Sequence, residues 1–153
     1  MSDSTAIDQG LIDYLLADAT LRGLMPDGVF WEEAGASMLT GGASTRFVLV
    51  SLVDEGDVDV FGGRAFEDGL YQVKAVEFVT ATMHIRAAAA RLDVLLDPQP
   101  PLAPAVIVIP GYGLMGSRRE TRIRMTEPDS ADPASLRVQH RGGHYRLQAS
   151  LVA

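Results

Sequence analysis

Three glycines, Gly111, Gly113 and Gly116, form the pattern G-x-G-x-x-G directly after an apolar run at residues 105–109. In dinucleotide-binding proteins these glycines bring the backbone close to a pyrophosphate, which the N-terminus of the following helix binds. Here the following residues, SRRETRIRMTEP, alternate between polar and apolar types, which is typical of a strand. Only 37 residues follow Gly116, too few for the rest of a doubly wound sheet. The pattern therefore predicts a flexible turn or extended hairpin at residues 110–118, and no cofactor site.

Two histidines offer a second candidate site, for a metal ion. His140 and His144 flank a predicted turn at residues 141–143, where their rings could meet. The chain contains no cysteine, and no carboxylate nearby in the sequence completes a set of metal ligands. We therefore expect two exposed histidines on paired strands, and no metal.

Four acidic side chains stand close together in the sequence: Asp54, Glu55, Asp57 and Asp59. Carboxylates in such a group could bind a hard cation, but these lack the spacing of a calcium loop. We predict a solvated acidic loop instead. No serine occupies a G-x-S-x-G motif and no H-E-x-x-H motif is present, so we predict no catalytic residue and no enzymatic activity.

Four arginines follow the glycine motif: Arg118, Arg119, Arg122 and Arg124. The last two share one face of a predicted strand at residues 121–126. Two interpretations remain open. The arginines could form a solvated strand edge, where charge prevents aggregation. Alternatively, they could pair with an acidic surface, such as residues 54–59 of a neighbouring copy, in a head-to-tail ring contact.

The composition fits a globular protein of one domain. The chain has 153 residues, of which 47% are hydrophobic and 22% charged, and this length can bury a proper core. A net charge of −7 argues against a general nucleic-acid binder, because phosphate binding needs a concentrated basic surface. We also expect no signal peptide and no membrane span, because no apolar run approaches the necessary length.

Apolar periodicity predicts two main helices and seven strands. One helix is expected at residues 5–21. The other is expected between its N-cap, Thr80 or Thr82, and Pro98, with an apolar stripe at residues 85–96. The strands are expected at residues 29–31, 46–53, 70–79, 105–109, 121–126, 136–140 and 144–152. Extended loops are expected near residues 33–45, 54–69, 98–104, 110–120 and 127–135.

This order, α-β-β-β-α-β-β-β-β, predicts a single α+β domain with a mostly antiparallel sheet and two main helices packed on one face. Residues 46–53 and 105–109 are predicted to be strands buried on both faces. Strand 70–79 changes its apolar face midway, so Val76 and Phe78 point away from the expected helices. We expect these two side chains to form an exposed interface patch, which would favour self-association into a closed ring.

Four segments of the chain resemble one family. They are the N-terminal LIDYLLADATLRGLMPDGVFWEE, the buried RFVLVSLV, the strand and alanine-rich helix at residues 69–97, and the C-terminal GGHYRLQASLVA. Together they resemble the tail terminator, or tail completion, proteins of long-tailed bacteriophages and gene transfer agents. The Pro- and Gly-rich segments at residues 98–104 and 110–118 depart from the family and look like an insertion or an extended arm.

The resemblance implies a structural virion protein. Members of the family form a ring of six subunits at the head-proximal end of the tail, after assembly in the host cytoplasm. The ring stops polymerisation of the tail tube and forms the surface that joins tail to head. The implied partners are further copies of the chain, the tail tube protein and a head–tail connector or neck protein. DNA passes through the lumen without specific binding, and an acidic lumen would assist this by repelling phosphate.

Two alternatives remain open. The chain could be another neck, tube-completion or secretion-tube component of similar fold. It could also be a small α+β enzyme or ligand-binding protein that uses residues 110–118.

Overall fold

The computed structural model describes residues 5–34, 45–79, 84–128 and 137–152. Within these ranges the helices are α1 (Thr5–Ala17), α2 (Ala19–Leu24) and α4 (Ile85–Leu96). The strands are β1 (Val29–Trp31), β2 (Arg46–Val60), β3 (Gly63–Val79), β4 (Tyr112–Pro128) and β5 (Arg137–Leu151). They form one sheet in the order β1-β2-β3-β5-β4, in which only the pair of β1 and β2 is parallel.

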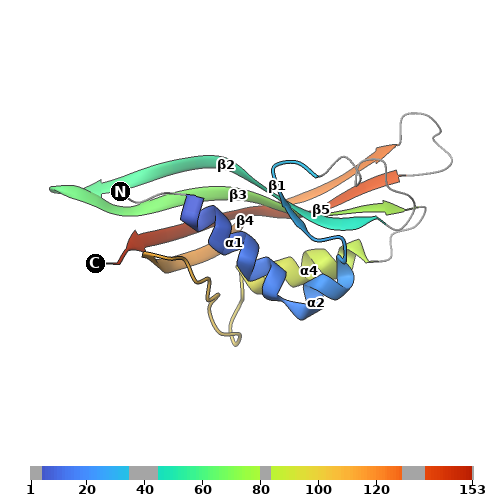
Figure 1. Ribbon diagram of the computed structural model, residues 1–153, viewed down its shortest axis with the longest axis horizontal. Coiled ribbons are helices and arrows are strands. Elements are labelled where there is room, and N and C mark those ends of the chain that lie inside the picture. The colour runs from blue at the N-terminus through green and yellow to red at the C-terminus, as the bar shows by residue number, and fades with distance from the viewer. Residues whose placement is uncertain (1–4, 35–44, 80–83, 129–136, 153) are drawn as a thin grey trace.

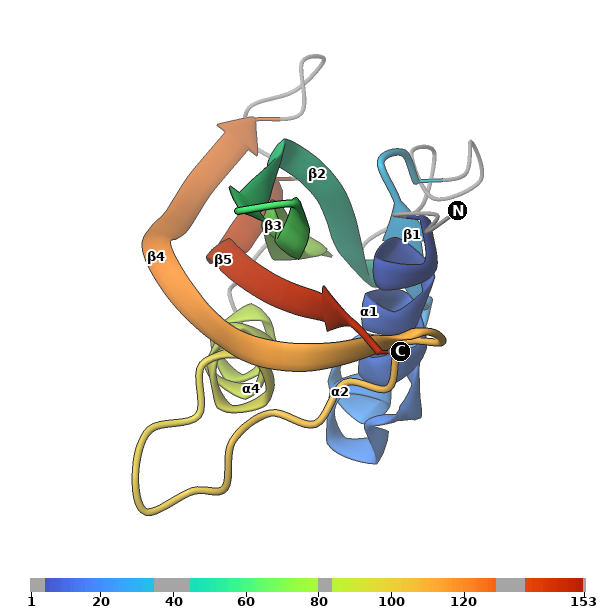
Figure 2. The same ribbon diagram turned by 90° about the vertical axis from the view of Figure 1, so that its left-hand side faces the viewer.

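The sheet and the helices form two layers. All three helices lie on one side of the sheet, and the hairpin of β2 and β3 extends beyond them at one end (Figure 1). Seen from that end, the sheet is strongly curved, and β4 bends round its outer edge (Figure 2). We call the side covered by the helices the helix side, and the opposite side the open side.

The main core lies between the sheet and the helices. Alternate sheet residues such as Val50, Val73 and Tyr145 face the helices, as the period of two requires. Leu11 from α1 and Leu92 from α4 pack against them and are fully buried. Burial of each such leucine stabilises the fold by roughly 1.5–3 kcal/mol. The predicted apolar stripe of residues 85–96 is confirmed.

A second, smaller apolar cluster occupies the open side. Phe47, Val76 and Phe78 are buried there, with Phe30 and Val138 packed against them. The prediction that Val76 and Phe78 form an exposed patch is therefore wrong, because the chain itself leaves them only 2% and 7% exposed. They do point away from the helices, as the change of face in the sequence indicates.

The helix ends differ from the prediction at two places. The single helix expected at residues 5–21 is interrupted at Asp18, whose carboxylate accepts a bond of 2.7 Å from the Leu21 amide and caps α2. The N-terminus of α4 is satisfied by Glu77 of β3, which is 1% exposed and accepts bonds from the amides of His84 and Ile85 at 3.3 and 3.0 Å. The predicted caps, Thr80 and Thr82, lie outside the described residues.

The C-terminal hairpin expected with a turn at residues 141–143 is also wrong, because β5 is one continuous strand. Gly142 and Gly143 lie within it, opposite Lys74 and Val73 of β3. A Cβ atom on Gly142 would lie 2.0 Å from the carbonyl oxygen of Val73. These glycines therefore permit a close approach of two strands, and they make no turn.

Three further expectations need correction. Residues 54–60 and 63–69 are not a loop but the paired ends of β2 and β3, joined by a turn at residues 61–62, and residues 112–120 belong to β4. Residues 105–109, predicted to be a strand buried on both faces, do not form a strand of the sheet. Ile107 and Ile109 are buried, whereas Val106 and Val108 are 72% and 80% exposed. Segment 46–53 is part of β2, but its burial ends before Val53, which is 52% exposed.

The predicted fold class is confirmed. The chain forms a single α+β domain with a mostly antiparallel sheet of five strands, two substantial helices and the short α2. Because two predicted strands merge into β5 and one is absent, the order over the described residues is α-α-β-β-β-α-β-β. Among these residues, no helix is both long enough and apolar enough to span a membrane.

Candidate functional site

The two edges of the sheet carry most of the candidate residues. β4 is the edge strand at one end of the sheet order, and among the described strands it pairs only with β5. At the other edge, β1 covers β2 only from Val48 to Val50. Beyond Val50, the described residues provide no second neighbour for β2. The sheet therefore has two unpaired edges, one basic and one acidic.

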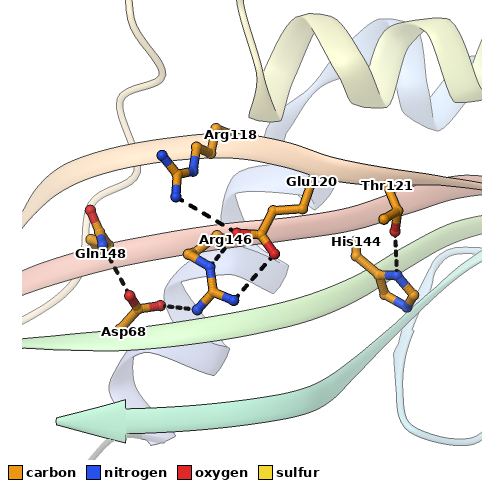
Figure 3. A network of polar contacts seen from close by, with 7 residues as sticks. All are labelled: Asp68, Arg118, Glu120, Thr121, His144, Arg146 and Gln148. Carbon is orange, nitrogen blue, oxygen red and sulfur yellow. Dashed lines mark hydrogen bonds and ion pairs between the residues drawn. The ribbon is translucent and has the colours of Figure 1, made fainter.

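Arg118 lies on the open side of β4 and belongs to a polar network (Figure 3). Its guanidinium is 3.7 Å from Glu120, which accepts two bonds from Arg146 at 2.5 and 3.2 Å. Arg146 also donates to Asp68 at 2.6 Å, and Gln148 donates to the other oxygen of Asp68 at 3.0 Å. The network joins β3, β5 and β4 across the open side.

These bonds shift the pKa values of the charged groups. Hydrogen bonds to Glu120 and Asp68 raise the pKa of the Arg146 guanidinium, and the bond from Arg146 lowers the pKa of Glu120. Burial raises the pKa of Asp68, but the bonds from Gln148 and Arg146 outweigh burial and hold it below its usual value. Arg146, Glu120 and Asp68 therefore stay charged near neutral pH and connect the strands.

Arg119 lies on the helix side and is also engaged within the chain. It donates to Asp93 of α4, and Asp93 accepts a further bond of 2.6 Å from the Tyr145 hydroxyl. The bond to Asp93 raises the pKa of Arg119. Arg119 thus holds α4 to the sheet, which makes it a structural residue.

Arg122 and Arg124 are different, because among the described residues their side chains form no hydrogen bond and no ion pair. Both are exposed on the helix side of β4. Arg86 of α4 and Arg141 of β5 lie beside them, and the four line a hollow of about 470 Å³. Burial, together with the charges of Arg124 and Arg86, lowers the pKa of Arg141. We call this group of four side chains the arginine hollow.

The predicted acidic residues lie on the β2 edge at the far end of the sheet. Glu55 and Asp57 pair in the ladder with Gly69 and Glu67, so they point to the helix side. Asp59 follows a register shift and pairs with Arg64, whose guanidinium contacts the helix-side carboxylates of Asp57 and Glu67. Asp54 lies opposite Leu70 and points to the open side. We call Glu55, Asp57 and Asp59 the acidic strip.

Only one residue of the acidic strip has an ion pair among the described residues. Asp57 lies 2.9 Å from Arg64, which also contacts Glu67 at 2.7 Å. The Tyr112 hydroxyl donates to Glu67 at 2.8 Å and links the hairpin to the start of β4. The strip borders a polar hollow of about 430 Å³, which reaches Ile7 and Tyr71.

Val76 and Phe78 form the floor of an apolar groove of about 560 Å³ on the open side. His140 lies beside them, is 8% exposed, and approaches Glu127 at 3.3 Å. Burial and the charge of Lys74 lower the pKa of His140, while Glu127 opposes the shift. The groove therefore combines aromatic surface with a histidine that is neutral near pH 7.

The histidines do not meet as the metal hypothesis required. His140 is buried, which corrects the expectation of exposure, and His144 bonds to Thr121 at 2.6 Å (Figure 3). No group of three His, Asp or Glu side chains in the described residues could hold a metal ion. The segment after Gly116 continues as β4, so it supplies no helix N-terminus to the glycine motif.

Sequence reasoning missed half of the arginine hollow. Arg86 and Arg141 stand apart from the predicted cluster in the sequence, and only the packing of α4 beside β4 and β5 brings them together. The period of the helix and the period of the strand give only a weak indication that Arg86 and Arg141 lie near each other. Arg86 follows the apolar Ile85 on α4, and Arg141 shares the parity of the inward-facing Tyr145.

Comparisons with known proteins establish the fold alone. No family model matches the chain, and no curated protein matches it. One solved structure has a similar fold, with a TM-score of 0.51 and 16% sequence identity. The alignment covers 100% of this chain and 98% of the chain in that structure. The name of that protein states neither an activity nor a partner.

Proposed function

We propose that this protein is a structural virion component that closes the end of a phage tail tube as a ring of six subunits. In this role it stops polymerisation of the tube and forms the surface for head–tail joining. The sequence segments that resemble tail terminator proteins motivate the proposal. The observation that carries it is the pair of unpaired sheet edges.

The two edges suit head-to-tail association. Strands β2, β3, β5 and β4 alternate in direction, so β2 and β4 run in opposite directions. If the next subunit has the same orientation, its β2 meets β4 as an antiparallel neighbour and the sheet continues. Such a contact uses a different surface on each partner, and it must either close into a ring or grow into a filament.

Exposed apolar side chains support contacts with other tail proteins. Phe61, at the tip of the β2–β3 hairpin, is fully exposed. Val106 and Val108, on the connection to β4, are each more than two-thirds exposed. None of the three belongs to either core cluster. Such positions fit contacts with the tail tube protein on one side and a connector or neck protein on the other.

Two alternative functions remain: one has equal support from the structure, and the other has less. A neck or tube-completion component would use the same edges, and only its neighbours in the particle would differ. A ligand-binding protein or enzyme that uses residues 110–118 is less favoured, because residues 112–118 are part of β4.

The proposal can be tested by measuring assembly directly. Native mass spectrometry and negative-stain microscopy of concentrated protein should give a closed ring of six. A matched variant in which residues 58–66 are replaced by a short Asn-Gly turn should stay folded, because the cores lack these residues, but should not form the ring. A stable two-fold dimer as the largest species would contradict the ring.

A further inference from the structure

The arginine hollow contains an electrostatic repulsion that is unfavourable in an isolated subunit. Arg86, Arg122, Arg124 and Arg141 converge from three elements, and like charges held close together repel. Asp93 also borders the hollow, but it already accepts bonds from Arg119 and Tyr145. The described part of the chain thus supplies no carboxylate to these four side chains.

We infer that the arginine hollow binds the acidic strip of a second copy of this chain. This inference rests on the proposed ring, and it names the side chains that hold one subunit to the next. The partner is therefore a β-strand that presents carboxylates at every second residue.

The first argument is that both surfaces lie on the same side of their edges. Arg124 pairs with Arg141, which in turn pairs with Ala75 of the main core, and this places Arg124 on the helix side. Glu55 and Asp57 of the acidic strip also face the helix side, as their ladder with β3 shows, and Asp59 pairs with Arg64 beside them. When β2 of one copy continues the sheet beside β4 of another, the helix sides coincide. Arginines and carboxylates then lie on one surface.

The second argument is their spacing. Arg122 and Arg124 are two residues apart on β4, as are the members of the acidic strip on β2. Along a strand this spacing is about 7 Å, so two arginines can face two carboxylates at once. The walls of the hollow include Ala89 and Ala90, whose short side chains leave room for the approaching strand.

The third argument is that the strip is available. Among the described residues Glu55 and Asp59 form no ion pair, and both are exposed. Phosphate groups of nucleic acid are a less suitable occupant, because the chain is acidic overall and five of the nine Lys and Arg side chains outside the hollow form ion pairs within the described residues. A second copy brings the complementary charge with it.

A charge-swap experiment tests the inference. Variant A carries R122E and R124E, and variant B carries E55R and D59R. Each variant alone places like charges at the contact, so its association should weaken at least about tenfold in sedimentation velocity. In a mixture, the reversed β4 of A faces at least one reversed residue in the acidic strip of B, and the unchanged arginines of B face the unchanged acidic strip of A. Association should therefore recover, with rings that alternate A and B and contain only even numbers of subunits.

The control is R118E, which makes the same change on the open side of β4 and should leave association unchanged. Circular dichroism should show that A and B remain folded, since all four substituted residues are exposed. If wild-type rings form and A and B assemble equally well alone, the inference fails and the ring stands. If A and B fail both alone and together, the acidic strip is not the partner.

Two further outcomes separate the inference from the proposed function. If the wild-type chain never associates at high concentration, the proposed function fails, and the inference fails with it. If the wild-type chain binds duplex DNA and variant A does not, the hollow is a phosphate site and the inference is overturned.

Discussion

Several polar side chains in this protein act far from their place in the sequence. Glu77 is a strand residue that caps a helix, and Asp18 both caps α2 and accepts bonds of 3.0 and 2.5 Å from Arg91 of α4. The sequence predicted nearby caps instead, because local patterns contain no information about long-range partners. The roles of buried or bridging polar residues become visible only when the elements are packed.

Glu77 offers a direct test at this scale. E77A removes the acceptor for the amides of His84 and Ile85 and leaves both donors unpaired at the start of α4. We expect the free energy of unfolding to fall by about 2 kcal/mol. Urea denaturation measures it, with E33A, which removes an exposed carboxylate, as the control. An unchanged midpoint in E77A would contradict this role for Glu77.

Asp68 should make part of the protein's folding stability depend on pH in the acidic range. Its pKa is lower in the folded chain than the ordinary value of 3.8, so the unfolded chain binds a proton more readily. Its contribution is complete above the unfolded pKa and is lost as pH falls through the folded pKa. Between about pH 5 and pH 2, D68N should therefore lose less stability than the wild type in thermal melts. Equal losses in both proteins would refute the assignment.

At the scale of elements, regular apolar patterns are sufficient to predict a helix or a strand, whereas patterns interrupted by glycines are not. The stripe of residues 85–96 and the core of RFVLVSLV predicted α4 and the first half of β2. The Gly-Gly pair at residues 142–143 predicts a turn, because such a pair between two alternating segments is typical of a hairpin. The pattern cannot distinguish a turn from a place where another backbone comes close, since both need a residue without a side chain.

The close contact of β5 with β3 gives the next prediction. In G142A the new methyl group would overlap the carbonyl of Val73, so the two strands must separate. We expect a loss of about 1–3 kcal/mol in the free energy of unfolding. G116A is the matched control, because no atom lies within 4 Å of the added carbon. A stable G142A would show that β5 does not lie so close to β3.

At the scale of the whole molecule, composition predicted the class of protein but not its surfaces. Length and composition predict one globular domain, and the order of the apolar patterns along the chain predicts its α+β class. The positions of the two unpaired edges depend on the strand order β1-β2-β3-β5-β4, in which β5 inserts between β3 and β4 and leaves β4 at the edge opposite β1 and β2. Charge clustering gave half of the arginine hollow. Topology supplied Arg86 and Arg141.

The overall charge gives a prediction about DNA. Acidic residues outnumber Lys and Arg by 20 to 13, so counterion release from phosphate can contribute little free energy to binding. We expect no appreciable binding of duplex DNA at physiological salt. A gel-shift assay at low-micromolar protein measures this, with a basic DNA-binding domain as the positive control. A shifted band at moderate salt would prove the prediction wrong.

The shortest strand has a consequence for the size of such a ring. β1 occupies the edge of β2 at three residues, from Val48 to Val50, so a β4 from the next subunit can slide along β2 only until it meets Trp31. In the proposed ring β1 is thus an end stop, and it sets the stagger between subunits. In a closed sheet the stagger, the tilt of the strands and the diameter are linked. Three residues remote from the charged contact would therefore help to set the bore through which DNA travels.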